Sequence, residues 1–434
     1  MSSTNYRVRS FATTENVVDP KLGLEAQLVR LVNASMLWED QFYLDGVEHS
    51  NLIKSLVAEL PATIVSAIAI HARQQLNLRH IPLLLCRELA RLGKLDYKVL
   101  NECIQRADEM AEFLSIYWLE GKQPISNQVK RGLALAFQKF SEYEIAKWDK
   151  NSSKITMRDV MFLAHPKPQN PEQTLLFKRV ADQELKTPNT WETKLSSGQD
   201  KRETFLELIK ENKLGALAYL RNLRNMLNSG IDIYTLEAYS QCVDFRKVLP
   251  FRYLAAYRAC PEAKQLLEQL MLKSLDHQEK LLGKTTLLID VSGSMFGMKV
   301  SKHSDLDRFD AAAALAVLCS EICEQVEIFT FSNKLVKVGP KSGFDLIEEM
   351  RDSQSHSGTQ LYEAVEQVYL PGNRLIVFTD EQAFTKPRAK VDCNNYIINV
   401  ASYKNGINED SWHTVTGFSE QVIRYIQESE KLDS

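Results

Sequence analysis

The hydrophobic pattern of this chain changes once, near Lys284, and that change limits the folds it can adopt. From about Leu22 to Leu282, apolar residues recur at helical spacing in successive segments of roughly 12 to 18 residues. After Lys284, buried-strand runs alternate with helical segments, which is typical of a mostly parallel sheet. With 434 residues the chain is also too long for one ordinary core. We therefore predict a multidomain protein with an all-α repeat region and a doubly wound α/β domain.

The helical region is punctuated by prolines at the points where a first helical turn would begin. These are Pro61, Pro82, Pro250 and Pro261, and Gly93 closes the segment that Pro82 opens. Short connections and the absence of alternating strands predict an α-solenoid or helical repeat array. The repeats have no fixed period, so we expect them to be degenerate.

Composition excludes several classes of protein. Apolar residues at 44% and charged residues at 25% are ordinary globular values, and a net charge of -3 gives no overall attraction to polyanions. The polar N-terminus has no signal-peptide core, and the apolar stretches Val65–Ile70 and Ile81–Cys86 are too short to span a bilayer. Seven scattered cysteines without a CxxC pair suit a reducing compartment. We expect a cytoplasmic location, no membrane partner, and a flexible segment at residues 1–20.

The C-terminal part, residues 284–434, contains five predicted strands and four predicted helices. The strands are Thr285–Val291, Val326–Phe331, an edge strand at Lys334–Val338, Arg374–Thr379 and Asn395–Val400. The helices are Leu306–Cys323, Phe344–Arg351, Gln360–Tyr369 and one that starts at Gln421.

Oxygen-bearing side chains follow two of these strands and one helix-connecting loop. Asp290, Ser292 and Ser294 alternate after the first strand, Thr359 lies in the loop, and Asp380 follows the strand Arg374–Thr379. Ligands of an open parallel sheet bind beyond the carboxyl ends of its strands, where these side chains can meet. Two carboxylates and three hydroxyls are hard donors that suit Mg²⁺ or Mn²⁺. The alternative is that these serine and aspartate side chains cap the N-terminus of the helix that follows and bind no metal.

These residues resemble the metal-ion-dependent adhesion site of von Willebrand factor A domains, over about Lys284–Ser434. The resemblance implies that Ser292, Ser294 and Thr359 contact the metal directly, and that Asp290 and Asp380 do so directly or through water. A serine nucleophile would need a GxSxG elbow and a base, whereas this chain reads Val-Ser-Gly-Ser-Met here. We therefore expect no enzymatic activity.

A second candidate site lies between Gly121 and Lys167, where basic residues outnumber acidic ones. In a helix through Lys130, the side chains of Leu133, Ala136, Phe137 and Phe140 form one apolar arc. Arg131, Gln138 and Lys139 fall on the opposite face, and His165 follows further along. Such a surface can bind phosphates, although scattered lysines are more often a solvated helix face.

The order of segments resembles the TROVE module of the Ro autoantigen family, which precedes a von Willebrand factor A domain in those proteins. The resemblance rests on KRGLALAF, YEIAKWDKNSSKITMRDVMFLAHPKP, LGALAYLRNLRNMLNSG and LPFRYLAAY. It implies a closed ring of HEAT-like repeats that binds small noncoding Y-type RNAs outside and single-stranded ends of misfolded RNAs in its central hole. Lys130, Arg131 and His165 match positions that contact RNA backbone, whereas Ala134 and Leu135 replace a further basic pair of Ro proteins.

Together these features predict a non-enzymatic, Ro-like RNA-binding protein with a TROVE domain at 21–282 and an A-type domain at 284–434. It would act as a scaffold in RNA quality control or for a nuclease partner. One alternative is a metal-dependent module that grips an Asp or Glu of a protein partner through Mg²⁺. Another is a component of a larger ribonucleoprotein, as in telomerase-associated TROVE proteins.

Overall fold

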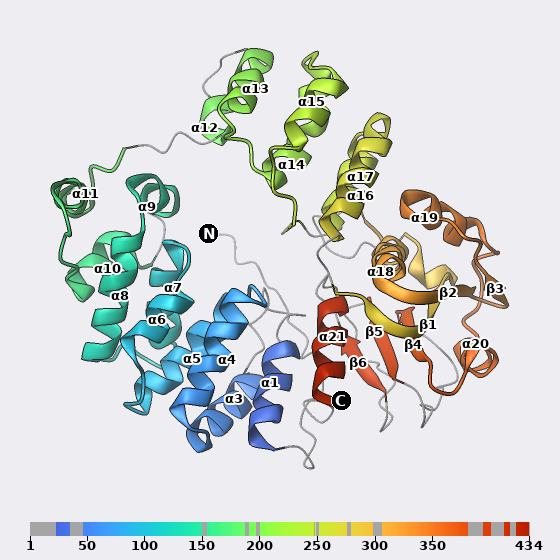
Figure 1. The fold of residues 1–434 in the computed structure, drawn as a ribbon, viewed down its shortest axis with the longest axis horizontal. Coiled ribbons are helices and arrows are strands. Elements are labelled where there is room, and N and C mark those ends of the chain that lie inside the picture. The colour runs from blue at the N-terminus through green and yellow to red at the C-terminus, as the bar shows by residue number, and fades with distance from the viewer. Residues whose placement is uncertain are drawn as a thin grey trace. The chain divides into compact units, whose positions relative to one another are not determined.

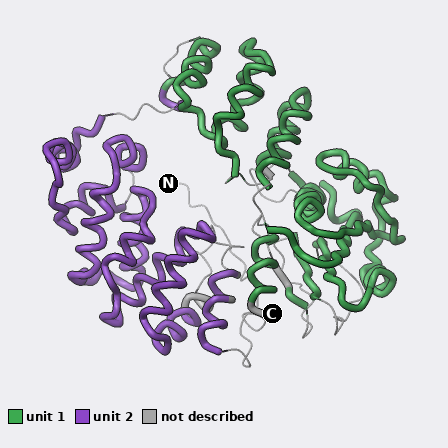
Figure 2. The backbone as a smooth tube through the Cα atoms, in the orientation of Figure 1, with its two compact units in different colours: residues 1–16, 194–431 green, residues 17–193, 432–434 purple. Residues whose placement is uncertain are grey.

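The structure is a computed structural model, and it divides into two compact units (Figure 2). Unit 2 is Val17–Thr193 with Leu432–Ser434, and unit 1 is Met1–Asn16 with Lys194–Lys431. The residues described are 23–34, 47–149, 154–186, 191–196, 200–246, 248, 251–275, 279–297, 306–380, 394–400, 412–416 and 422–433. The expected flexible segment at residues 1–20 lies outside them.

The described part of unit 2 is helical throughout, as the sequence predicted (Figure 1). Its helices are α1 (Leu24–Ala34), α3 (Val47–Glu59), α4 (Ala62–Gln74), α5 (His80–Arg91), α6 (Tyr97–Cys103), α7 (Asp108–Tyr117), α8 (Asn127–Lys139), α9 (Glu142–Trp148), α10 (Met157–Ala164), α11 (Pro171–Asp182) and α12 (Trp191–Ser196), the last of which extends into unit 1. Contacts run between near neighbours in sequence, such as α4 with α5, α6 with α8 and α8 with α10. This short-range pattern is typical of stacked helical repeats.

Local signals set the ends of these helices. Pro61 is the N-cap of α4, and Gly93 at φ 68° ends α5 in the left-handed conformation that glycine adopts readily. α5 begins at His80, so Pro82 lies within its first turn rather than at its start. The Ser126 hydroxyl caps α8 by accepting a hydrogen bond from the backbone N–H of Val129.

A buried ion pair joins three helices of unit 2. Arg73 on α4 donates to the carboxylate of Glu109 on α7 at 2.6 Å and to the backbone carbonyl of Cys103 at the end of α6 at 3.1 Å. The other carboxylate oxygen of Glu109 accepts the N–H groups of Gln105 and Arg106. Side-chain exposure is 8% for Arg73 and 0% for Glu109, so the pair is removed from water.

Unit 1 begins with further helices. They are α13 (Lys201–Lys210), α14 (Ala216–Asn228), α15 (Ile233–Ser240), α16 (Phe251–Ala259) and α17 (Lys264–Leu275), the last entered through a 3₁₀ turn at Pro261–Ala263. Two buried tyrosines fasten α14 to α15: the Tyr219 hydroxyl donates to the Leu236 carbonyl, and the Tyr239 hydroxyl donates to the Leu214 carbonyl.

The rest of unit 1 is a six-stranded sheet with the strand order β3-β2-β1-β4-β5-β6. Its strands are β1 (Leu281–Asp290), β2 (Cys323–Phe331), β3 (Leu335–Lys337), β4 (Arg374–Thr379), β5 (Asn395–Asn399) and β6 (His413–Thr416). All neighbours pair in parallel except the edge strand β3, which is antiparallel to β2. The five predicted strands are confirmed, whereas β6 was not predicted.

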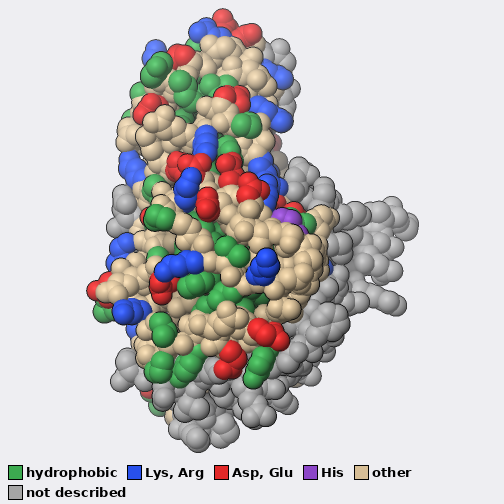
Figure 3. Space-filling model, turned by 90° about the vertical axis from the view of Figure 1, so that its right-hand side faces the viewer, with side chains coloured by type: hydrophobic (Ala, Val, Ile, Leu, Met, Phe, Trp, Pro, Cys, Tyr) green, Lys and Arg blue, Asp and Glu red, His purple; other side chains and the backbone are tan. Residues whose placement is uncertain are grey.

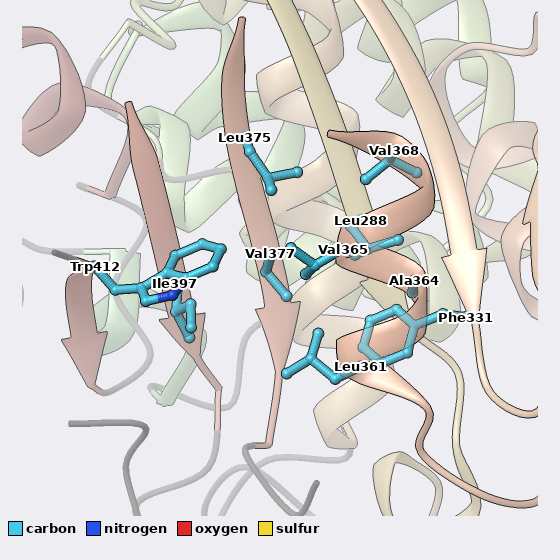
Figure 4. Packing of buried hydrophobic residues seen from close by; sticks show 10 residues of the cluster. All are labelled: Leu288, Phe331, Leu361, Ala364, Val365, Val368, Leu375, Val377, Ile397 and Trp412. Carbon is cyan, nitrogen blue, oxygen red and sulfur yellow. The ribbon is translucent and has the colours of Figure 1, made fainter. Parts of the chain in front are cut away.

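Four helices accompany the sheet: α18 (Arg308–Ile322), α19 (Gly343–Asp352), α20 (Leu361–Val368) and α21 (Val422–Asp433). The chain moves from β1 to β2 through α18 and then crosses to β4 on the other side of β1 through α20. Right-handed crossovers in opposite directions place these helices on opposite faces of the sheet. α20 covers its face through a cluster around Leu288, Val365 and Val377 (Figure 4). A helical region followed by a doubly wound α/β domain is therefore present.

Helices α16 and α17 pack directly on α18 and α19 within unit 1. The rings of Tyr257 and Phe344 stack with centroids 4.5 Å apart, and Lys264 pairs with Asp345 at 2.5 Å. The compact unit therefore extends across residue 284, where the sequence pattern predicts a domain boundary, and the first strand begins at Leu281. Among the described residues no helix is long and apolar enough to cross a membrane.

Candidate metal centre and nucleic-acid interface

The predicted metal-binding loop lies at the carboxyl end of β1. The buried carboxylate of Asp290 accepts the backbone N–H of Ser292 at 2.8 Å and the hydroxyl of Thr379, at the end of β4, at 2.6 Å. The hydroxyl oxygens of Ser292 and Ser294 are 3.2 Å apart, which brings two hydroxyl donors to one point. The ends of the two central strands are thus joined through Asp290.

The loop that carries Thr359 is held against the same place. The N–H of Gly293 donates to the carbonyl of Ser357 at 3.3 Å, and the Ser332 hydroxyl, just after β2, donates to the carbonyl of Gly358 at 2.9 Å. A Cβ atom at Gly358 would lie 2.4 Å from Oδ1 of Asn333, so a side chain there would displace the Asn333 amide, which accepts the N–H of Gly358. Thr359 itself is half-buried, two residues after Ser357, whose carbonyl binds Gly293.

The burial of Asp290 away from basic side chains is compatible with a cation site. Burial raises the pKa of this carboxyl to about 6, against the hydrogen bonds from Ser292 and Thr379 that lower it. Asp290 is 0% exposed, and no basic side chain of the described residues contacts it. Buried carboxylates are normally paired with a cation or coordinated to a metal. No described cluster contains three His, Cys, Asp or Glu in metal-binding geometry, as expected where hydroxyls supply most donors.

Arg308 is a site residue that the sequence prediction missed. It is the first residue of α18, and its guanidinium donates to the buried carboxylate of Asp380 at 2.7 Å. The same nitrogen lies 3.4 Å from the carbonyl oxygen of Ser294. Nothing in the pattern around Arg308 indicates this contact, because its partner is 72 residues away.

The candidate RNA surface is centred on α8. The predicted apolar arc is buried, including Leu133, Ala136 and Phe137, and the opposite side faces outward. Arg131 is exposed and lies over the ring of Tyr97 on α6, 3.8 Å from its centroid. Lys130 is half-buried, and no described acidic side chain pairs with its ammonium group. Two adjacent cations without carboxylate partners are therefore available to an anion.

Lys139 has a different environment. Its ammonium group donates to the backbone carbonyls of Asn101 and Ile104, both at 2.5 Å, and so binds the C-terminal end of α6. Burial lowers the pKa of Lys139. An ammonium has three N–H donors, so one is left for another partner. RNA contact by Lys139 stays a prediction. In the structure, Lys139 caps the C-terminal end of α6.

His165 caps α10 in a strained conformation. Its φ of 50° and ψ of 55° lie in the left-handed region, and its side chain is exposed. The loop after it packs on the end of α8, because Gln138 donates to the carbonyl of Lys167 at 2.6 Å. That end of α8 is eight residues, or roughly 12 Å, beyond Lys130. His165 therefore lies at one end of the surface and the Lys130–Arg131 pair at the other.

We expect His165→Gly to keep the stability of unit 2 or raise it by up to about 1 kcal/mol, because glycine adopts the left-handed conformation without strain. The same change should lower RNA affinity severalfold, since strained exposed residues persist where the side chain has a task. Chemical denaturation and filter binding measure the two effects. Full RNA affinity in a stable H165G protein would show that the imidazole makes no RNA contact.

Further basic and aromatic side chains, not singled out from the sequence as site residues, line these helices. Arg158 lies over the half-exposed ring of Phe162 on α10, 5.4 Å from its centroid. On α14, Arg221 and Arg224 are exposed one turn apart. Their spacing of three residues could have been recognised in the sequence, because positions three apart lie on the same face of a helix. On the face seen in Figure 3, by contrast, basic and acidic side chains lie interspersed.

Comparisons with known proteins agree with this architecture. Residues 178–300 match the TROVE domain family. Telomerase protein component 1 is 37% identical in Rattus norvegicus and 38% in Mus musculus, each over 79 residues, which is 17% of this chain. The chain spans only 3% of the length of those relatives. The crystal structure of the Ro (RSR) protein of Deinococcus radiodurans aligns with a TM-score of 0.64 over 86% of this chain and 92% of that one, at 16% identity.

The chain is thus a helical-repeat protein that continues into a doubly wound α/β domain. Residues 178–300 match the TROVE domain family, in line with the resemblance seen in the sequence, and the fold is similar to that of the Deinococcus Ro protein. The von Willebrand factor A assignment of the α/β domain and its metal stay predictions.

Proposed function

We propose that this chain is an RNA-binding protein of a ribonucleoprotein. The TROVE match at residues 178–300 and the fold similar to that of a Ro protein support this function. In the finer proposal, its helices bind a small noncoding RNA of the Y type and single-stranded ends of misfolded RNA. The protein then acts as a non-enzymatic, cytoplasmic scaffold in RNA quality control or for a nuclease.

The observation that carries this proposal is the pair Lys130 and Arg131 on α8. The guanidinium of Arg131 makes a cation–π contact with the ring of Tyr97, and the Arg131 side chain is exposed. Gly132 permits this arrangement, because a Cβ there would lie 2.9 Å from the Leu100 side chain and 3.0 Å from the Tyr97 carbonyl. α8 therefore lies close to α6, and the guanidinium of Arg131 projects over an aromatic ring next to Lys130 in the sequence, as suits contact with an RNA backbone.

The test is filter binding of the full chain to a structured small RNA and to a single-stranded oligonucleotide. Because the chain has a net charge of -3, affinity must come from local phosphate contacts. It should then fall steeply between about 50 and 200 mM salt. Failure to retain either RNA at low ionic strength would remove the proposal.

We expect Lys130→Glu with Arg131→Glu to lower RNA affinity about 10- to 100-fold and to reduce the slope of log affinity against log salt by about 2. The fold should persist, since neither side chain belongs to the apolar arc of α8. Lys334→Glu with Lys341→Glu, two exposed positions near β3, is the control with the same change in net charge. Equal losses in both variants would mean that only the overall charge matters.

The metal centre favours a second candidate function, which is docking of a protein partner. Asp290, Ser292, Ser294, Thr359 and Asp380 would hold Mg²⁺ or Mn²⁺ as in a von Willebrand factor A domain, and a partner's Asp or Glu would complete the shell. The converging hydroxyls of Ser292 and Ser294 support this proposal. A pull-down repeated with a chelator and with ribonuclease separates the two functions, because only metal-dependent docking would be lost with chelator and survive ribonuclease.

A further inference from the structure

Arg308 lies inside the candidate metal centre. Its side chain is only 7% exposed and its partner carboxylate, Asp380, is 0% exposed. One guanidinium nitrogen contacts Asp380 at 2.7 Å and approaches the Ser294 carbonyl at 3.4 Å. The cation therefore bridges the end of β4 and the Asp-x-Ser-x-Ser loop, the two places that supply the predicted ligands.

This position alters the charge that a metal would meet. Asp290 and Asp380 together carry a formal charge of -2, and Arg308 reduces it to -1. Arginine keeps its charge throughout the physiological pH range. In a buried site, repulsion between a guanidinium and a dication is weakly screened, and the Oδ2 atom of Asp380 that accepts from Arg308 has less negative charge to offer a metal.

The position of Arg308 is fixed by its helix. Asp307 is the N-cap of α18 and forms a reciprocal capping box with Asp310, so the first turn is well defined. Asp310 in turn is held by Arg351 at 2.9 Å and by Arg258. The guanidinium of Arg308 is thus directed toward Asp380 by a constrained helix start.

We propose that Arg308 is a built-in counter-cation that sets the divalent-cation affinity of this centre by competing for Asp380. The inference rests on the proposed metal site and is independent of RNA binding. Weak, exchangeable metal binding follows, so the centre responds to metal concentration instead of holding a permanent ion. Asp380 would hold a metal at the expense of its contact with Arg308.

The test is titration of the full chain with Mn²⁺ alone, followed by electron paramagnetic resonance and calorimetry. We expect Arg308→Gln to tighten Mn²⁺ binding about tenfold or more. Without metal, R308Q should melt at a lower temperature than the wild type, and Mn²⁺ should raise its melting temperature by a larger amount. Arg351→Gln is the matched control, because it removes the same charge from a residue bound to Asp310 rather than to Asp380.

Arg308→Lys provides a second variant in case R308Q does not fold. Lysine keeps the charge but loses the planar fork, so R308K should bind Mn²⁺ more tightly than the wild type and less tightly than R308Q. Affinity equal to or weaker than wild type in the folded variants would overturn the proposal, as would an equal gain in R351Q. If neither the wild type nor any variant binds Mn²⁺, the proposed metal site is wrong. The proposed RNA-binding function would still stand, because the filter assay tests it separately.

Discussion

Glu109→Ala is expected to lower the free energy of unfolding of unit 2 by about 3–5 kcal/mol. The reason is that the mutation removes one partner of a buried ion pair and leaves the other in place. Arg73 would keep its charge with 8% of its side chain exposed, and only the Cys103 carbonyl would remain to receive a hydrogen bond. The N–H groups of Gln105 and Arg106 would also lose their common acceptor.

Urea denaturation followed by circular dichroism measures this loss, and hydrogen exchange assigns it to α4, α6 and α7. Glu102→Ala is the matched control on α6, because Glu102 is exposed and accepts only a peripheral hydrogen bond from Gln74 at 2.9 Å. It should cost less than about 1 kcal/mol. Similar losses in the two variants would contradict the assignment of Arg73 and Glu109 as a central fastening of unit 2.

Glu430→Ala is expected to destabilise the α/β domain by about 3 kcal/mol, again by isolating a buried arginine. Arg374, at the start of β4, makes two hydrogen bonds to Glu430 on α21, at 2.6 and 2.5 Å. A third goes to the hydroxyl of Thr285 on β1 at 2.7 Å. The pair therefore fastens the last helix to the central strands.

Differential scanning calorimetry of the full chain checks this value, with Lys431→Ala as control. Lys431 is the next residue on α21, and its side chain is 53% exposed, so its ion pairs should contribute little. Replacing both partners, as Arg374→Met with Glu430→Leu, should cost less than Glu430→Ala alone, because no unpaired charge stays buried. A double variant less stable than the single one would refute this explanation.

Sequence patterns were sufficient to predict those features of the fold and the site that depend on residues close together in the chain. The loop Asp290–Ser294 and the strand end at Asp380 were predictable because donor spacing and strand position are both local. Helical spacing likewise predicted which face of α8 is buried. β6 was missed because four residues, His-Thr-Val-Thr, give too short an alternation to separate from a loop.

Contacts distant in sequence were beyond such reasoning. The pairing of Arg308 with Asp380 depends on how α18 and β4 meet, and no spacing rule encodes it. The same holds for Lys139, whose ammonium binds carbonyl groups at the end of α6 rather than facing solvent alone. Backbone carbonyls have no sequence signature, so helix-end contacts of this kind require the structure.

The packing of α16 and α17 on α18 and α19 determines where this chain can be cut into soluble fragments. A fragment starting at Glu279, two residues before β1, would expose Phe344 without Tyr257 and would leave Asp310 without Arg258. Both losses favour aggregation during expression. Fragment design should instead begin at Asp200, ahead of α13, so that α16 and α17 accompany α18 and α19, on which they pack.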